Sequence, residues 1–155
     1  MRRFMSLLIV VFLLGSLSAL AESNPAKPAA LKTVAIDGAP KAVGPYSQGV
    51  IANGFLYTAG QIPLDPKTGN LVEGDITVQT NRVFDNLEAV LKGAGCMFGD
   101  VVKATVFMTD LADFAKMNEA YAKRFGDNRP ARSTVQVAKL PKGATLEIDL
   151  VARVH

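Results

Sequence analysis

The chain of 155 residues has a single cysteine, Cys96, and a single histidine, His155, which is its last residue. One cysteine excludes an intrachain disulfide. The same shortage excludes a metal site built from histidine and cysteine ligands, a Ser-His-Asp triad and a Cys-His dyad. Any chemistry must therefore use Arg, Lys, Glu, Asp, Tyr, Ser or Thr side chains, or backbone groups.

The first part of the chain has no acidic residue. Arg2 and Arg3 precede an uncharged apolar run at residues 4–20, which ends in Ala19-Leu20-Ala21. This pattern is typical of a secretory signal peptide, residues 1–21, cleaved after Ala21. The alternative is an uncleaved membrane anchor, for which the run is marginal because the hydrocarbon layer is about 30 Å thick. We therefore expect an exported protein, periplasmic or secreted, with no membrane attachment after cleavage.

The segment after the cleavage site is rich in proline and alanine, and we predict a disordered leader at residues 22–30. A single domain, residues 31–155, remains. Removing the signal peptide takes away two positive charges and no negative charge, so the formal net charge falls from +3 to +1. The mature chain has no basic stripe suited to nucleic acid, so no nucleic-acid partner is expected and a nuclease role is the least expected function.

Hydrophobic periodicity and turn residues predict an α+β fold. Asn53-Gly54 is typical of a two-residue hairpin turn, and Asp75 is a good N-cap for a helix. The order β-β-β-α-β-α-β-β implies a mixed β-sheet with two helices packed on one face. The other face would be half apolar and in need of a partner, which indicates a homo-oligomer. The expected strands are residues 31–36, 50–52, 55–59, 101–108, 130–138 and 144–154, and the expected helices are residues 76–92 and 111–125.

The last two expected strands carry the candidate chemistry. Glu147 alternates with apolar residues on the second, and Arg132 and Thr134 lie on the polar alternation of the first. If the two strands pair or lie close, the guanidinium and the carboxylate project toward one surface. A fixed cation beside a general base is what a small carboxylate-bearing substrate attacked by water needs. The alternative is that both residues solvate an exposed sheet face.

The second expected helix carries an aromatic stripe that we interpret as core. Its inner face would hold Phe114, Tyr121 and Phe125, together with Met117 or Asn118. Asn118 either caps a packed region or faces a site, and it is kept as a candidate substrate-binding residue. Upstream, Tyr46 offers a hydroxyl within a loop rich in glycine and proline.

Several motifs, in the same order along the chain, resemble the RidA/YjgF family of enamine/imine deaminases over residues 31–154. These motifs are Gly44-Pro45-Tyr46-Ser47-Gln48-Gly49, Gly60-Gln61-Ile62-Pro63, Val101-Val102-Lys103-Ala104-Thr105-Val106-Phe107, Pro130-Ala131-Arg132-Ser133, Leu140-Pro141-Lys142-Gly143 and Leu146-Glu147-Ile148. The resemblance implies a chorismate-mutase-like fold and a homotrimer with three active sites at the subunit clefts. It also implies hydrolysis of 2-enamine/2-imine acids, such as 2-aminoacrylate, 2-iminopropanoate and 2-iminobutanoate, to 2-oxo acids and ammonia, without metal or organic cofactor.

Carried over by position, the resemblance gives roles to individual residues. Arg132 would hold the substrate carboxylate with both arms of its planar fork. Glu147 would orient and activate the water that adds to the imine carbon. Tyr46 would close over the substrate, and Gly60 would allow backbone to approach it closely.

Two positions depart from the usual family pattern. Thr134 stands where deaminating members usually have cysteine, and Ala59 replaces a frequent serine before Gly-Gln. Main-chain contacts at these candidate substrate-binding positions are unchanged by the substitutions, whereas side-chain contacts are lost. Together with the expected export, these departures motivate an alternative, a non-catalytic member of the family that binds small carboxylates or acts as a chaperone.

Overall fold

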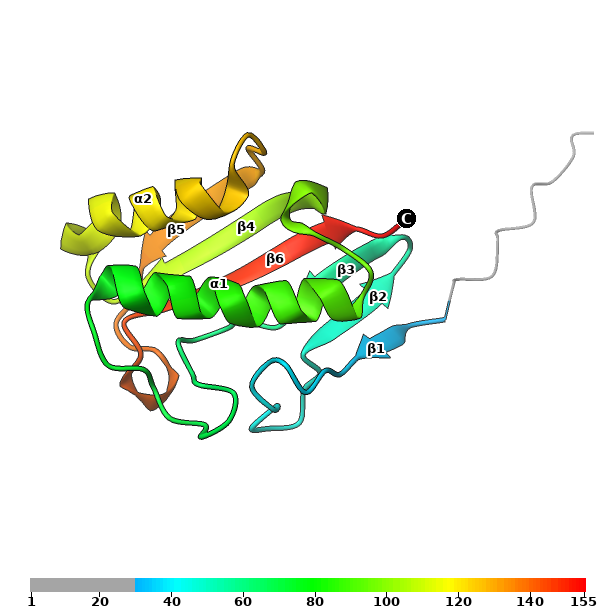
Figure 1. Cartoon of the computed structure of the whole chain (residues 1–155), viewed down its shortest axis with the longest axis horizontal. Helices are drawn as coiled ribbons and strands as arrows, with labels where there is room; N and C mark the ends of the chain where they lie inside the picture. Colours follow the sequence, from blue (N-terminus) through cyan, green and yellow to red (C-terminus); the bar gives the residue numbers. More distant parts are fainter. Residues whose placement is uncertain (1–29) are drawn as a thin grey trace, which may run out of the picture.

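The computed structural model describes residues 30–155, in which one six-stranded mixed sheet carries both α-helices on the same face (Figure 1). The predicted fold class and element order are confirmed. The predicted signal peptide, and the leader apart from Ala30, lie outside the described residues. The elements are β1 (Lys32–Val34), β2 (Gly49–Ala52), β3 (Phe55–Thr58), α1 (Ile76–Gly93), β4 (Val101–Met108), α2 (Phe114–Phe125), β5 (Ala131–Gln136) and β6 (Leu146–Arg153), with short 3₁₀ turns at Phe98–Asp100, Leu111–Asp113 and Pro141–Gly143.

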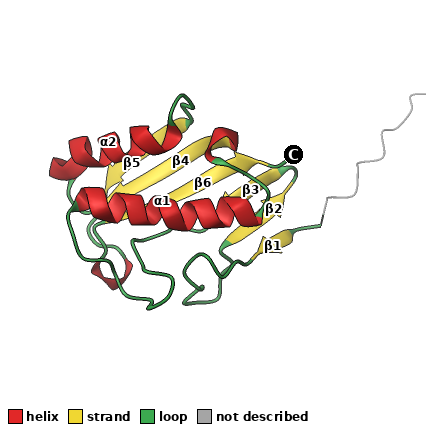
Figure 2. Ribbon diagram, viewed as in Figure 1, coloured by secondary structure: helices red, strands yellow, loops and turns green. Residues whose placement is uncertain are grey.

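The strands lie in the order β1-β2-β3-β6-β4-β5, so β6, the last strand of the chain, lies in the middle of the sheet (Figure 2). All neighbours are antiparallel except β4 and β5, which are parallel and are joined through α2. Asn53 and Gly54 both have positive φ, 49° and 79°, as the predicted hairpin turn between β2 and β3 requires. This order makes β5 an edge strand.

The core lies between the sheet and the helices. Leu146, Ile148 and Leu150 of β6 are buried, as are the residues of α1 that face the sheet. The Asp75 carboxylate accepts a hydrogen bond from the Val78 backbone N–H at 3.0 Å, so the predicted N-cap is confirmed. No helix among residues 30–155 is both long and apolar enough to cross a membrane.

The second helix is shorter than predicted. A 3₁₀ turn occupies Leu111–Asp113, where the Asp110 carboxylate accepts a hydrogen bond from the Ala112 backbone, and α2 begins at Phe114. Phe114 does not lie in the core with the other aromatic residues of the helix, because its side chain is 38% exposed.

The prediction that Arg132, Thr134 and Glu147 share one surface is wrong within a protomer. Strand β5 pairs with β4 and not with β6; in its register Arg132 lies beside Ala104 and Thr134 beside Val106. Both neighbours are fully buried under the helices, so Arg132 and Thr134 lie on the helix-covered face. Glu147 alternates with the buried residues of β6 and therefore lies on the opposite, open face. A period of two shows which residues of one strand share a face, but it does not relate that face to another strand.

Candidate functional site

Six of the seven predicted site residues line two different cavities. Tyr46, Ala59, Gly60 and Glu147 line a cavity of about 300 Å³. On the helix side of β5, Asn118 and Arg132 line a second cavity of about 410 Å³. The seventh residue, Thr134, lies next to Arg132 on the same face of β5; its hydroxyl is buried and has no hydrogen-bond partner within residues 30–155.

Gly60 lies against the Glu147 side chain. The backbone of Gln61 exchanges two hydrogen bonds with Ile148, at 2.9 and 3.1 Å, which fixes the loop after β3 beside β6. A Cβ atom added to Gly60 would lie 2.7 Å from Cδ and 2.9 Å from Cγ of Glu147. The Glu147 carboxyl group therefore occupies the space that any other residue at position 60 would fill. The family resemblance implies that the backbone at Gly60 comes close to the substrate. The structure shows that Gly60 lies close to Glu147, the candidate base.

The environment of Glu147 suits proton transfer. Partial burial raises the pKa of the Glu147 carboxyl, and the charge of Asp149, two residues along on the same face, raises it further. Burial also raises the pKa of Asp149, although a hydrogen bond from Thr105 and the charge of Lys103 act in the opposite direction. A carboxyl group whose pKa lies nearer to neutrality than usual can both accept and return a proton.

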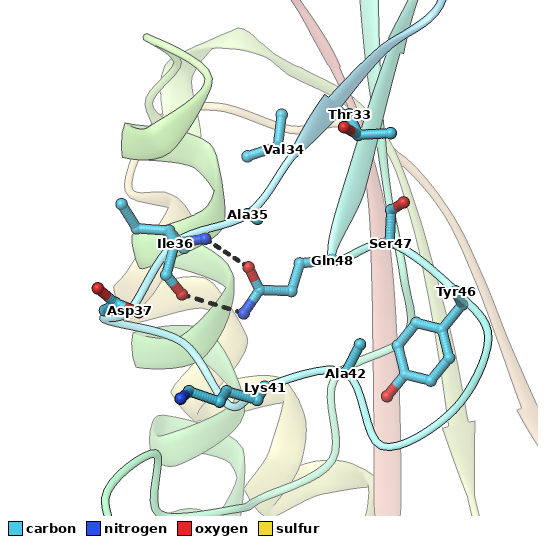
Figure 3. Close-up of a pocket in the computed structure, with 10 residues that line it drawn as sticks. All are labelled: Thr33, Val34, Ala35, Ile36, Asp37, Lys41, Ala42, Tyr46, Ser47 and Gln48. Carbon is cyan, nitrogen blue, oxygen red and sulfur yellow. Dashed lines mark hydrogen bonds between the residues drawn. The ribbon is translucent and has the colours of Figure 1, made fainter.

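Gln48 supports the loop that carries Tyr46. Its side-chain amide accepts a hydrogen bond from Ile36 N at 2.6 Å and donates one to Ile36 O at 3.1 Å (Figure 3). It also donates to Pro40 O at 2.8 Å. The backbone groups of Ile36 are thus bonded to a side chain, which explains why β1 ends at Val34. Sequence reasoning gave this buried glutamine no role, although it stands inside one of the quoted motifs.

Tyr46 stands between two cavities. Besides the cavity that contains Glu147, it lines one of about 450 Å³ next to β1, and Figure 3 shows its ring at one side of that space. The Tyr46 side chain is 48% exposed, and its hydroxyl accepts a hydrogen bond from Val43 N at 3.2 Å. The Tyr46 ring is thus partly exposed at the border of the cavity that contains Glu147.

Arg132 is held by aromatic rings. Its guanidinium carbon lies 4.5 Å from the ring centroid of Tyr121 and 5.6 Å from that of Phe114, both on α2. Within residues 30–155 Arg132 has no ion-pair partner. By contrast, Arg124 of α2 forms an ion pair with Asp85 at 2.7 Å. A guanidinium that is packed on rings but not neutralised can still bind a carboxylate through two hydrogen bonds.

The two groups are far apart within one protomer. Strand β4 separates β5 from β6, and Arg132 and Glu147 lie beside β4 residues three positions apart, Ala104 and Phe107. With a strand spacing of about 4.8 Å and a rise of about 3.3 Å per residue, the separation is roughly 10 Å across the sheet and roughly 10 Å along it. Because the residues also lie on opposite faces, one small acid cannot touch both in the same protomer.

In the described part of the chain, no group of three or more His, Cys, Asp and Glu residues is placed to hold a metal ion. The residues that can bind or transfer a proton in these cavities are the Arg132 cation, with Asn118 beside it, and the Glu147 carboxyl group, with Tyr46 beside it.

The chain is similar to known proteins over nearly all of its described length. The family described as Endoribonuclease L-PSP matches residues 36–154. The 2-iminobutanoate/2-iminopropanoate deaminase of Salmonella typhimurium is 46% identical over 124 residues, which cover 78% of this chain and 96% of that protein. The crystal structure of RidA from an Antarctic Psychrobacter is 43% identical, with a TM-score of 0.77 over 79% of this chain and 99% of that one. Escherichia coli TdcF, crystallised with bound serine, is 42% identical, with a TM-score of 0.76 over 80% of this chain and 99% of that one.

Proposed function

The chain belongs to the endoribonuclease L-PSP (RidA/YjgF) family, and we propose that it hydrolyses reactive 2-enamine and 2-imine acids to 2-oxo acids and ammonia. The observation that carries this proposal is the environment of Glu147. Its carboxyl group lines a cavity, has a raised pKa and fills the space left by Gly60. The deaminase names of relatives such as the Salmonella protein support the same reaction class. The preferred substrates would be 2-iminopropanoate and 2-iminobutanoate.

We propose that each active site is shared between two copies of the chain. Arg132 and Glu147 lie on opposite faces of the sheet, so one protomer cannot apply both to one small substrate. Arg132 of one copy and Glu147 of the next would form a complete site, and we propose a homotrimer, the assembly that the family resemblance implies. The half-apolar open face, with Tyr57 49% and Val135 42% exposed, offers the surface for such assembly.

In this site Arg132 binds the substrate carboxylate, and Asn118 lies beside it on the same cavity. The Glu147 carboxylate accepts a proton from water while the water oxygen bonds to the carbon of the protonated imine. The resulting tetrahedral adduct carries a hydroxyl and an amino group on that carbon. Protonated Glu147 then returns the proton to the nitrogen. As the C–N bond breaks and ammonia leaves, the hydroxyl oxygen becomes the carbonyl of the 2-oxo acid and gives its proton to Glu147, which passes it to ammonia or solvent. Serine, the molecule bound to TdcF, is a small amino acid and thus also carries a carboxylate.

The direct test is an imine assay on the chain from Glu22 onward. An amino-acid oxidase generates 2-iminopropanoate in the presence of semicarbazide, and semicarbazone formation is followed with and without the protein. Wild type should suppress the semicarbazone, and Glu147→Gln should not. If wild type fails to suppress it but calorimetry shows tight binding of 2-oxobutanoate, the cleft is a carboxylate-binding site and the deaminase proposal is wrong.

Shared sites are tested by mixing two inactive variants. Arg132→Ala and Glu147→Gln chains, coexpressed in equal amounts, would form sites in which each residue is intact with a probability of one half. About one quarter of the wild-type activity should then return. The control pairs Arg132→Ala with a chain that carries both substitutions, which leaves every site without Arg132. No recovery in the first mixture would show that the two residues do not meet across an interface.

We also propose that the protein acts after export, because the predicted signal peptide precedes the family-matched region.

A further inference from the structure

We infer that Tyr121 and Phe114 are positioning residues for Arg132, and that the ring of Tyr121 performs this role without its hydroxyl. The inference rests on the proposed function, in which Arg132 binds the substrate carboxylate. A guanidinium fork binds a carboxylate well when it is held in one orientation before the ligand arrives. The two rings of α2 supply that restraint.

The geometry carries the first step. Phe114 and Tyr121 are seven residues apart, which is two helical turns, so both rings lie on the face of α2 that meets β5. Arg132 lies at 4.5 and 5.6 Å from their centroids and has no ion-pair partner within residues 30–155. The contact with Arg132 also accounts for the position of Phe114 at the exposed start of the helix.

The two rings differ in how firmly they are held. The Tyr121 ring stacks on Phe125 at 4.4 Å and meets Phe84 edge-on at 5.6 Å, so the core fixes its position. Phe114 makes no such aromatic pair within the described residues and is 38% exposed. Tyr121 is therefore the firmly held ring against which the guanidinium packs, and Phe114 adds a second ring at the exposed start of α2.

The Tyr121 hydroxyl is buried and has no hydrogen-bond partner in residues 30–155. Burial raises the pKa of this hydroxyl, and the nearby Arg132 charge acts in the opposite direction. An unpartnered buried hydroxyl stabilises nothing, so a phenylalanine ring should hold Arg132 equally well.

The test compares Tyr121→Phe with Tyr121→Leu in the full mature chain. The readouts are the Kd for 2-oxobutanoate by calorimetry and the separate kcat and KM for the imine. Tyr121→Phe should match wild type. Tyr121→Leu should raise Kd and KM by between about twofold and thirtyfold, the range expected for loss of a cation–π contact, and should leave kcat within about twofold. The matched control is Phe98→Leu, which removes a ring of the same aromatic cluster that does not touch Arg132.

The outcomes separate this inference from the proposed function. The inference would be overturned if Tyr121→Leu kept the wild-type Kd and KM. It would also be overturned if Tyr121→Phe raised Kd and KM as much as Tyr121→Leu does. A rise in Kd for Phe98→Leu as large as for Tyr121→Leu would overturn it too, because both would then reflect general loosening. If Tyr121→Leu does not fold, Phe114→Leu takes its place in the test, because Phe114 is partly exposed. Its Kd for 2-oxobutanoate should rise by about twofold to fivefold. The proposed function itself fails if Arg132→Ala binds 2-oxobutanoate as wild type does.

Discussion

Replacing Gly60 by alanine should impair catalysis without unfolding the chain. The added methyl group would meet the Glu147 side chain at 2.7 Å from Cδ and 2.9 Å from Cγ. Carbon atoms in ordinary contact lie about 3.5–4.0 Å apart, so the carboxyl carbon must move by about 1 Å. The atoms it meets belong to the end of a flexible side chain, which means that the carboxylate moves and the backbone stays.

The cost to activity follows from that displacement. A misplacement of about 1 Å in a reacting group reduces the rate by roughly 100-fold, which corresponds to about 2.7 kcal/mol of transition-state stabilisation. The cost to stability should be small, because Gly60 does not have a positive φ and alanine can adopt its conformation. Alanine also restricts the unfolded chain, which favours folding by about 0.4–1 kcal/mol.

The assay is kcat/KM for 2-iminopropanoate, combined with denaturant unfolding of the same samples. Gly99→Ala is the matched control, because a Cβ atom there meets only the Met97 side chain, at 3.9 Å, and φ is not positive. It should retain wild-type activity. In a Glu147→Gln background, Gly60→Ala should cause little further loss, since both changes act on the same group. A Gly60→Ala variant with kcat/KM within threefold of wild type would refute the reasoning.

Further predictions concern charge, pH and processing. Arg132→Ala should lower kcat/KM at least about tenfold, because it removes a charge-assisted bond worth roughly 1.5–3 kcal/mol; Arg132→Lys should not restore the rate, and a full rescue by lysine would exclude bidentate binding. Asp149→Asn should shift the acid limb of the kcat/KM profile to lower pH, since removing its charge lowers the raised pKa of Glu147; an unmoved limb would mean that another group titrates. Glu147→Gln should unfold at a higher denaturant concentration than wild type as pH rises above 4.5, the ordinary carboxyl value, because burial disfavours the ionised form in the folded state. At pH values below 4.5 the unfolding midpoints of the two chains should converge. A difference in midpoint that does not change with pH would contradict an origin in the ionisation of Glu147. Mass spectrometry of the exported protein should give Glu22 as its first residue, and retention of Met1 would contradict cleavage.

Much of the fold could be predicted because its signals are local. The Asn53-Gly54 turn and the Asp75 cap each depend on the chemistry of one or two residues, and both are confirmed. The alternation in β6 separated Glu147 from the buried residues on either side of it. Each of these signals acts within one element, where the spacing of side chains is fixed by backbone geometry.

The candidate site was harder to predict because it depends on strand order. The sequence neighbours β5 and β6 are not neighbours in the sheet, so the shared face expected for Arg132 and Glu147 did not follow. The helical period also placed Phe114 in the core, although the ring packs on Arg132 at the exposed start of α2. The motif that contains Gln48 did not reveal the role of this side chain, since that role depends on hydrogen bonds to Ile36 and Pro40, which are distant in the sequence.

The placement of Arg132 and Glu147 on opposite faces of one sheet has a consequence for enzyme concentration. Under the proposed shared site, a newly made single chain has no complete active centre and is inert until it meets other chains. Specific activity should therefore fall on dilution below the dissociation constant of the assembly and recover on concentration. An enzyme with its whole centre in one chain would keep the same turnover per molecule at every dilution. If the chain is exported as proposed, such a dependence would also keep it inactive as a single chain and confine turnover to the compartment in which copies accumulate.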